Sequence, residues 1–173
     1  MKNLKKILAI VLALTLALSL TACGTGTTST VSSSGTLEVT EGKADPAAAD
    51  FANDIDGLVS YLKECELIVG EATDMSADFI GAVKGKQFCF TYVDATITVE
   101  LYEFDLSNLS DKASSYLESA KTSKALEILG KSVPCEINAE GKFVMIVNID
   151  KTGETFDAYK ADLVKNFTEF LGK

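Results

Sequence analysis

Histidine, arginine and tryptophan are absent from this 173-residue sequence, and all sixteen of its basic residues are lysines. Without histidine there is no imidazole to bind a metal or to titrate near neutrality. A serine–histidine–aspartate triad and a cysteine–histidine pair are therefore excluded. Without arginine there is no planar fork for bidentate contact with phosphate or carboxylate. We accordingly expect no metal, no cofactor and no catalytic centre of these kinds.

The residues that are present suffice for one folded domain. Hydrophobic residues make up 47% of the chain and aromatic residues 8%, which is enough to form a core, and the length favours a single domain. Lys2, Lys5 and Lys6 lie in a leader that has no acidic residue. Thirteen lysines then remain against 25 acidic residues, a net charge of −12. Such a charge argues against nucleic acid or an anionic membrane surface as a direct partner.

The beginning of the chain combines three features in order. The segment MKNLKK precedes an apolar run of 14 residues, ILAIVLALTLALSL, and small residues surround Cys23 in LTACG. A membrane-spanning helix needs about 20 apolar residues, whereas the hydrophobic core of a secretory signal has about 7–15. The run is therefore predicted to belong to a signal peptide.

The stretch LTAC, which ends at Cys23, resembles the lipobox of bacterial lipoprotein signal peptides. The resemblance implies cleavage between Ala22 and Cys23, so that residues 1–22 are removed, and transfer of a diacylglyceryl group to the Cys23 thiol. It also implies a lipid anchor on the extracytoplasmic face of the cell membrane. Two acyl chains, at about 0.8 kcal/mol per buried CH₂, hold a protein stably there. The alternative is an ordinary cleaved leader in which Cys23 carries no lipid.

The segment that follows Cys23, up to residue 45, is rich in Gly, Ser and Thr and has no apolar period. This composition predicts a flexible tether, with a root-mean-square reach of about 25 Å for about 21 residues. We therefore expect three parts: the signal peptide at 1–22, the lipidated cysteine with a disordered linker at 23–45, and one domain at 46–173.

Three helices are predicted within that domain. Asp45-Pro46 has the residues of a helix start, and apolar residues at helical spacing follow, so the first helix is expected to end near Gly70. Ser110 is placed to cap a second helix. The third is expected over about 154–171, where aromatic and leucine residues recur at helical spacing.

Strands are predicted where apolar residues alternate. Two long strands flank a tight turn near Asp94, and the segments 135–138 and 142–149 form a second hairpin. A short strand around 78–83 is expected to pair across Lys84-Gly85. Both faces of 142–149 are apolar, which is typical of a central strand.

The strand after Asp94 breaks its own alternation at its end. Its polar side chains, such as Thr98 and Glu100, occupy the even-numbered positions, and the aromatic residues Tyr102 and Phe104 fall at even-numbered positions too. Either a bulge near Leu101 or a second layer packed over the end of the strand would account for them.

These elements predict the α+β class: an antiparallel sheet of about four to five strands with about three packed helices. The segments VELYEFD at 99–105 and GKFVMIVN at 141–148, with the closing helix, resemble uncharacterised small lipoproteins of Gram-positive-type bacteria. The resemblance covers roughly residues 78–171. It implies the fold and the location, and it brings no activity and no site residues.

Three cysteines, Cys65, Cys89 and Cys135, follow Cys23. Because this number is odd, at least one thiol stays free within a chain. Cys89 and Cys135, if they lie on adjacent strands, are the one pair that we consider for a disulfide.

The best candidate for a ligand patch is formed by Thr98, Glu100, Tyr102 and Glu103, which place an aromatic ring among hydroxyls and carboxylates on one region of the sheet. The alternative is that Tyr102 is a core or edge packing residue.

Three functions remain open on this basis. The first is a non-enzymatic, lipid-anchored binding or interaction protein, with a protein or small molecule as its ligand and the membrane held through Cys23. The second is a carboxylate-dependent hydrolase of the cell envelope, using a pair such as Glu100 and Glu103. The third is an envelope-stabilising or inhibitory protein that occupies the surface of a partner.

Overall fold

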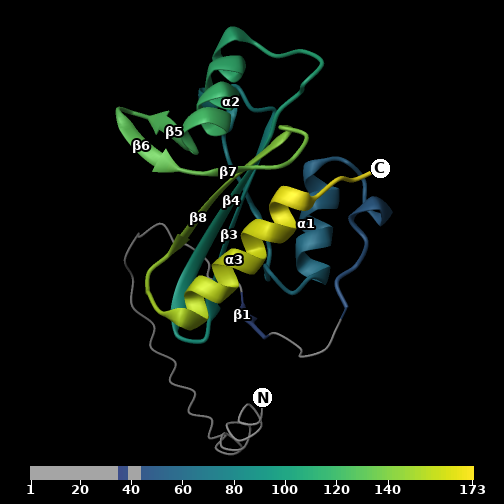
Figure 1. The fold of residues 1–173 in the computed structure, drawn as a ribbon, viewed down its shortest axis with the longest axis vertical. Coiled ribbons are helices and arrows are strands. Elements are labelled where there is room, and N and C mark those ends of the chain that lie inside the picture. Colours follow the sequence, from purple (N-terminus) through teal and green to yellow (C-terminus); the bar gives the residue numbers. More distant parts are fainter. Residues whose placement is uncertain (1–34, 39–43) are drawn as a thin grey trace, which may run out of the picture. The chain divides into compact units, whose positions relative to one another are not determined.

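The computed structural model describes residues 35–38 and 44–173, and it has the predicted α+β fold (Figure 1). Ala22, Cys23 and the signal peptide lie outside the described residues, as does most of the predicted linker. The three helices are α1 (Ile55–Glu64), α2 (Asp111–Ser123) and α3 (Glu154–Glu169). Within the described residues, no helix combines the length and the hydropathy needed to cross a membrane.

A six-stranded sheet forms the centre of the fold. Its strands are β1 (Thr36–Leu37), β2 (Thr73–Asp74), β3 (Lys84–Tyr92), β4 (Ala95–Glu103), β7 (Glu136–Ile137) and β8 (Phe143–Ile149). The spatial order is β1-β3-β4-β8-β7, with β2 also paired to β3. All pairs are antiparallel except β1 with β3, so the sheet is mixed and has more strands than predicted. A separate hairpin consists of β5 (Ala125–Ile128) and β6 (Lys131–Pro134).

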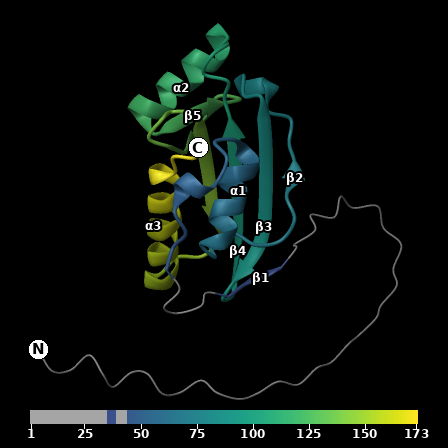
Figure 2. The same ribbon diagram turned by 90° about the vertical axis from the view of Figure 1, so that its right-hand side faces the viewer.

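The sheet has a hydrophobic core on each face. Helices α1 and α3 cover one face, where Phe88, Val99 and Phe167 are fully buried (Figure 1). Helix α2 and the β5–β6 hairpin contribute to the second core, which lies toward one end of the sheet and includes Leu117 and Leu126 (Figure 2). Because neighbouring residues of a strand point to opposite faces, β4 and β8 supply side chains to both cores.

The second core explains the two residues that break the alternation. The register between β3 and β4 runs without interruption from Lys84 opposite Glu103 to Tyr92 opposite Ala95, so the pair contains no bulge. Tyr102 and Phe104 instead enter the core beneath α2. Of the two explanations, the second packing layer is confirmed.

The second predicted hairpin is confirmed as well. Strand β8 lies between β4 and β7, and both of its faces are apolar because Val144 and Met145 enter different cores. Ser110 caps α2 as predicted, since its hydroxyl oxygen accepts a hydrogen bond from the Ala113 amide at 3.1 Å.

The first helix begins later than predicted. Its N-cap is Asp54, whose Oδ1 accepts from the Gly57 amide at 2.8 Å, and not Asp45. Residues 48–50 form a separate 3₁₀ turn. The helix also ends well before Gly70, because Glu66 adopts a left-handed φ of 57°.

Two further elements differ from the prediction. Residues 78–80 form a 3₁₀ turn in place of a strand, and Lys84-Gly85 lies inside β3 instead of forming a turn. The β5–β6 hairpin was not predicted. Its strands are short, and its two-residue turn places Leu129 in a left-handed conformation that leucine rarely adopts.

Strand β1 lies within the segment that was predicted as a disordered linker. Thr36 and Leu37 pair in parallel with Thr91 and Tyr92, and the Gly35 carbonyl accepts from the Thr91 amide at 3.0 Å. Leu37 is 5% exposed and belongs to the core beneath α1 and α3. The sequence around it is polar, which is why composition alone did not reveal a strand.

Candidate functional site

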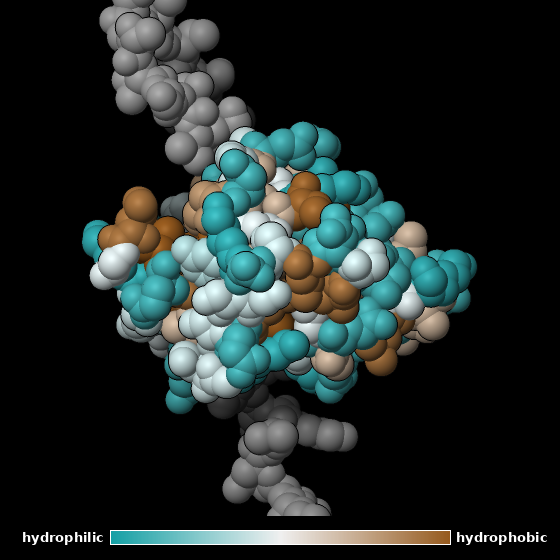
Figure 3. All heavy atoms as spheres, turned by 90° about the horizontal axis from the view of Figure 1, so that it is seen from above, coloured by the Kyte–Doolittle hydropathy of each residue, from teal (hydrophilic) through white to brown (hydrophobic). Residues whose placement is uncertain are grey.

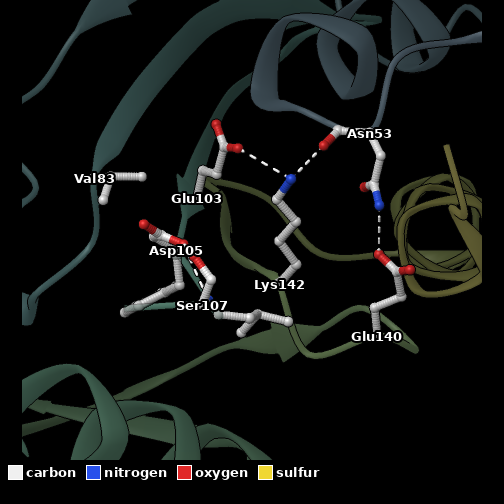
Figure 4. A pocket seen from close by; sticks show the side chains of 9 residues that line it. Asn53, Val83, Glu103, Asp105, Ser107, Glu140 and Lys142 are labelled. Atoms are coloured by element: carbon white, nitrogen blue, oxygen red, sulfur yellow. Dashed lines mark hydrogen bonds and ion pairs between the residues drawn. The ribbon is translucent and has the colours of Figure 1, made fainter. Parts of the chain in front are cut away.

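A cleft of about 640 Å³ lies at the end of the sheet where β4 stops and β8 starts (Figure 4). Four segments form it: the residue before β3, the residue before the cap of α1, the end of β4 with the loop after it, and the turn before β8. The Phe104 amide donates to the Lys142 carbonyl at 2.9 Å and so holds the last two segments together. The lining residues are Asn53, Val83, Glu103, Phe104, Asp105, Leu106, Ser107, Glu140 and Lys142.

An ion pair between Glu103 and Lys142 forms one side of the cleft. Lys142 Nζ lies 3.3 Å from Glu103 Oε1 and also donates to the Asn53 carbonyl. The other carboxylate oxygen of Glu103 accepts from the Ile55 amide, in the first turn of α1, at 3.2 Å. The two side chains are only 10% and 21% exposed. A cation and a helix N-terminus therefore compensate for the burial of this carboxylate.

Asn53 connects this pair to the opposite wall. Its Nδ2 donates to Glu140 Oε2 at 2.8 Å, and its own amide donates to the carbonyl of Lys173 at 3.0 Å. Its Oδ1 is buried and has no hydrogen-bond partner among the residues that the structure describes. A buried acceptor without a donor lowers the free energy of unfolding by about 1–3 kcal/mol. Such unpaired buried acceptors are uncommon in folded proteins.

Asp105 and Ser107 form a turn on the third wall. Asp105 Oδ1 accepts from the Ser107 amide at 3.0 Å and from its hydroxyl at 2.6 Å. These hydrogen bonds hold the pKa of Asp105 below its ordinary value, because they favour the charged carboxylate. Asp105 is consequently ionised at neutral pH.

Apolar side chains form the lip of the cleft. Val83 is 57% exposed and Leu106 is 44% exposed. Seen from the α2 end, the surface is largely hydrophilic, and hydrophobic residues form small separate patches (Figure 3). The cleft thus combines hydrogen-bond acceptors inside with apolar contacts at its edge.

Acceptors outnumber donors among the charged groups of this cleft, since three carboxylates share it with one lysine. The arrangement suits a ligand group that is positively charged or rich in N–H donors. No group of three or more cysteine and acidic side chains stands close enough to hold a metal ion within the described residues.

The predicted ligand patch is divided between the two faces of the sheet. Thr98, Glu100 and Tyr102 share one face, whereas Glu103 points to the face that α1 covers. Tyr102 is 3% exposed and packs in the core, so the packing alternative is correct for this residue. Glu100 accepts from Tyr102 Oη at 2.9 Å and from Gln87 Nε2 at 3.0 Å. Glu100 and Glu103 therefore do not line one catalytic cleft.

The predicted disulfide is wrong. Cys89 and Cys135 are not joined to each other. Cys89 lies on β3, whereas Cys135 directly precedes β7, and β4 and β8 separate these strands. Three strand spacings amount to about 14 Å, far beyond the Cα separation of about 7 Å that a disulfide can span.

Sequence reasoning identified Glu103 but missed Asn53, Asp105, Glu140 and Lys142. These four residues lie outside the helices and strands and have no motif around them. Their proximity depends on how the strands pair. The one local signal was Gly141, which has a φ of 77° and marks the turn that places Lys142 at the cleft.

Comparison with protein-family models, with curated proteins and with solved structures gives no match for this chain.

Proposed function

We propose that this protein is a lipid-anchored, extracytoplasmic binding protein without enzymatic activity. The observation that carries the proposal is the order of features that ends in LTACG: lysines, an apolar run of signal-peptide length, and a cysteine among small residues. Lipid on Cys23 would hold the α+β domain outside the membrane, where its strongly acidic surface stays in solvent.

The proposed binding site is the cleft around Glu103 and Lys142. Its volume of about 640 Å³ suits a small molecule or a single side chain of a peptide. Glu103 is already paired, whereas Asp105 and Glu140 carry further charge on two other walls. A cationic amine is the group that these acceptors would bind most strongly.

The anchor is tested by replacing Cys23 with serine. We expect the wild-type protein to fractionate with membranes and to yield an N-terminal peptide with a diacylglyceryl thioether in mass spectrometry. The Cys23→Ser variant should be released or remain unprocessed. Cys89→Ser serves as the matched control and should behave as wild type, since Cys89 lies within β3. A wild-type protein that carries no lipid would contradict the anchor.

The binding site is tested with a trilysine peptide and its side-chain-acetylated form as probes. We expect trilysine to bind and the acetylated form to bind much more weakly. The double variant Asp105→Asn, Glu140→Gln should raise the Kd for trilysine about tenfold, which corresponds to 1.4 kcal/mol.

The control for this experiment is the double variant Glu118→Gln, Glu127→Gln, which removes the same charge from exposed positions of α2 and β5. It should leave the Kd for trilysine nearly unchanged. Equal losses in the two double variants would mean that trilysine responds to net charge and not to the cleft.

A further inference from the structure

Strand β1 determines where the chain leaves the folded domain. Thr36 and Leu37 occupy the edge of β3, and the Leu37 side chain is 5% exposed within the core. The hydrogen bond from the Thr91 amide to the Gly35 carbonyl, at 3.0 Å, extends this attachment by one residue. Burial of a leucine side chain contributes about 1.5–3 kcal/mol, so the attachment is more than a surface contact.

This attachment point and the cleft lie at opposite ends of the sheet. Strand β1 pairs with β3 next to the turn that joins β3 to β4, whereas Glu103 of the cleft pairs with Lys84 at the other end. Seven residues separate Lys84 from Thr91, which corresponds to about 23 Å along the strand. Figures 1 and 2 show β1 at the end of the sheet opposite α2.

Without β1 the tether would join the domain at a later residue. The next described segment begins at residue 44 and leads, through the 3₁₀ turn, to Asn53 in the wall of the cleft. A tether that extended to residue 44 would be nine residues longer and would no longer be fixed to β3. With β1 in place, the tether instead joins the domain at the far end of β3.

We infer that β1 is an anchoring strand that holds the cleft on the side of the domain facing away from the membrane, so that the cleft takes its ligand from the space beyond the bilayer and not from lipid headgroups. This inference rests on the proposed lipidation of Cys23. Eleven residues lie between Cys23 and Gly35, and their composition predicts a root-mean-square reach of about 18 Å. That reach is shorter than the distance from β1 to the cleft.

Energy transfer to labelled lipid headgroups tests the inference. The lipidated protein is placed in phospholipid vesicles that carry a headgroup acceptor, after Cys65 and Cys89 are changed to serine. A donor dye is attached either at Asp94→Cys, in the turn beside β1, or at Val83→Cys, on the lip of the cleft. We expect stronger transfer from position 94 than from position 83.

The variant Leu37→Asp should detach β1 and abolish the difference in transfer between the two positions. Leu37→Ala provides a milder variant if the charged one does not fold, and circular dichroism establishes folding for both. Leu129→Asp is the matched control, because Leu129 is 97% exposed, and it should preserve the difference.

Each remaining outcome has a distinct meaning. A protein that carries no lipid overturns the proposed function and this inference with it. A lipidated protein with equal transfer from both positions, or with stronger transfer from position 83, overturns this inference alone.

Discussion

The pair formed by Glu103 and Lys142 is a largely buried ion pair, with its two charges 3.3 Å apart. Each member is largely buried, and each has partners besides the other: the Ile55 amide for Glu103 and the Asn53 carbonyl for Lys142. Removal of Glu103 takes away the carboxylate partner of the Lys142 ammonium. Removal of Lys142 leaves the carboxylate with the Ile55 amide and with Lys84, whose Nζ lies 4.0 Å from Glu103 Oε2. Either single change weakens the compensation of a buried charge, whereas removal of both side chains relieves that cost.

We predict that Glu103→Gln and Lys142→Met each lower the free energy of unfolding by about 1–3 kcal/mol. The double variant should lose less than the sum of the two, which a double-mutant cycle in urea would measure. Lys124→Met is the control, since the Lys124–Glu136 pair is exposed and contributes about 0–1 kcal/mol. Additive losses would mean that the two side chains act independently.

Leu129 is an exposed leucine in a left-handed backbone conformation, which costs stability. It is 97% exposed and has a φ of 51° at the first position of a two-residue hairpin turn, followed by Gly130 with a φ of 74°. Asparagine tolerates this conformation better than leucine, and Asn-Gly is a preferred sequence for such a turn.

We predict that Leu129→Asn raises the free energy of unfolding by about 0.5–1 kcal/mol. Thermal unfolding measures the effect, and Leu171→Asn, at another exposed leucine, should not stabilise the protein. A lower melting temperature for Leu129→Asn would show that the leucine has a structural role in the β5–β6 hairpin.

At the scale of elements, the start of α1 shows that residues typical of a helix start do not always form one. Asp45-Pro46 has the residues of a helix start, yet the cap is Asp54. We predict that Asp54→Ala lowers the free energy of unfolding by about 1 kcal/mol. Asp45→Ala should have little effect, and urea unfolding of the two variants compares them directly. The reverse ranking would contradict the cap at Asp54.

The elements that could be predicted are those with long periodic patterns. The β3–β4 hairpin and the α3 helix follow from side chains that repeat with the period of a strand or a helix, such as Phe88 with Phe90 and Leu163 with Phe167. Ser110 was a reliable cap because apolar residues at helical spacing follow it immediately. After Asp45 the apolar pattern starts only several residues later, so the residues of a helix start at Asp45-Pro46 did not indicate where α1 begins.

The elements that could not be predicted are short and depend on tertiary pairing. Strand β1 has one buried side chain, Leu37, in a polar segment, so its two residues show no period. The cleft was missed for the same reason. Asn53 and Lys142 are 89 residues apart, and only the pairing of β4 with β8 and the position of α1 bring them together.

At the scale of the whole molecule, one sheet supports two hydrophobic cores, and buried tyrosines lie in both. Tyr61 and Tyr159 belong to the core beneath α1 and α3, and their hydroxyls donate to Asn166 Oδ1 and to the Leu67 carbonyl, each at 2.7 Å. Tyr102 belongs to the second core and donates to Glu100. Ionisation of any of these hydroxyls would remove a donor and place a charge in the interior.

These groups predict that the protein loses stability at alkaline pH. Burial raises the pKa of Tyr61, Tyr102 and Tyr159 above the usual value of 10.0, and the Glu100 charge adds to the rise at Tyr102. Burial also raises the pKa of the Cys135 thiol to about 11 from an ordinary value of 9.0. The folded state therefore keeps protons that the unfolded chain releases. The stability that this provides is fully present below about pH 9 and falls as the pH rises further.

Urea unfolding at a series of pH values from 8 upward, with tyrosinate absorbance as a second probe, measures this loss. Each proton retained only by the folded state contributes a slope of about 1.4 kcal/mol per pH unit. Tyr102→Phe should reduce the slope above the ordinary tyrosine pKa, because it removes one such proton while the aromatic ring stays in the second core. Cys89→Ser, in β3, is a control that leaves these tyrosines and Cys135 in place. A free energy of unfolding that stays constant across this range would contradict the prediction, as would full ionisation of the tyrosines in a protein that remains folded.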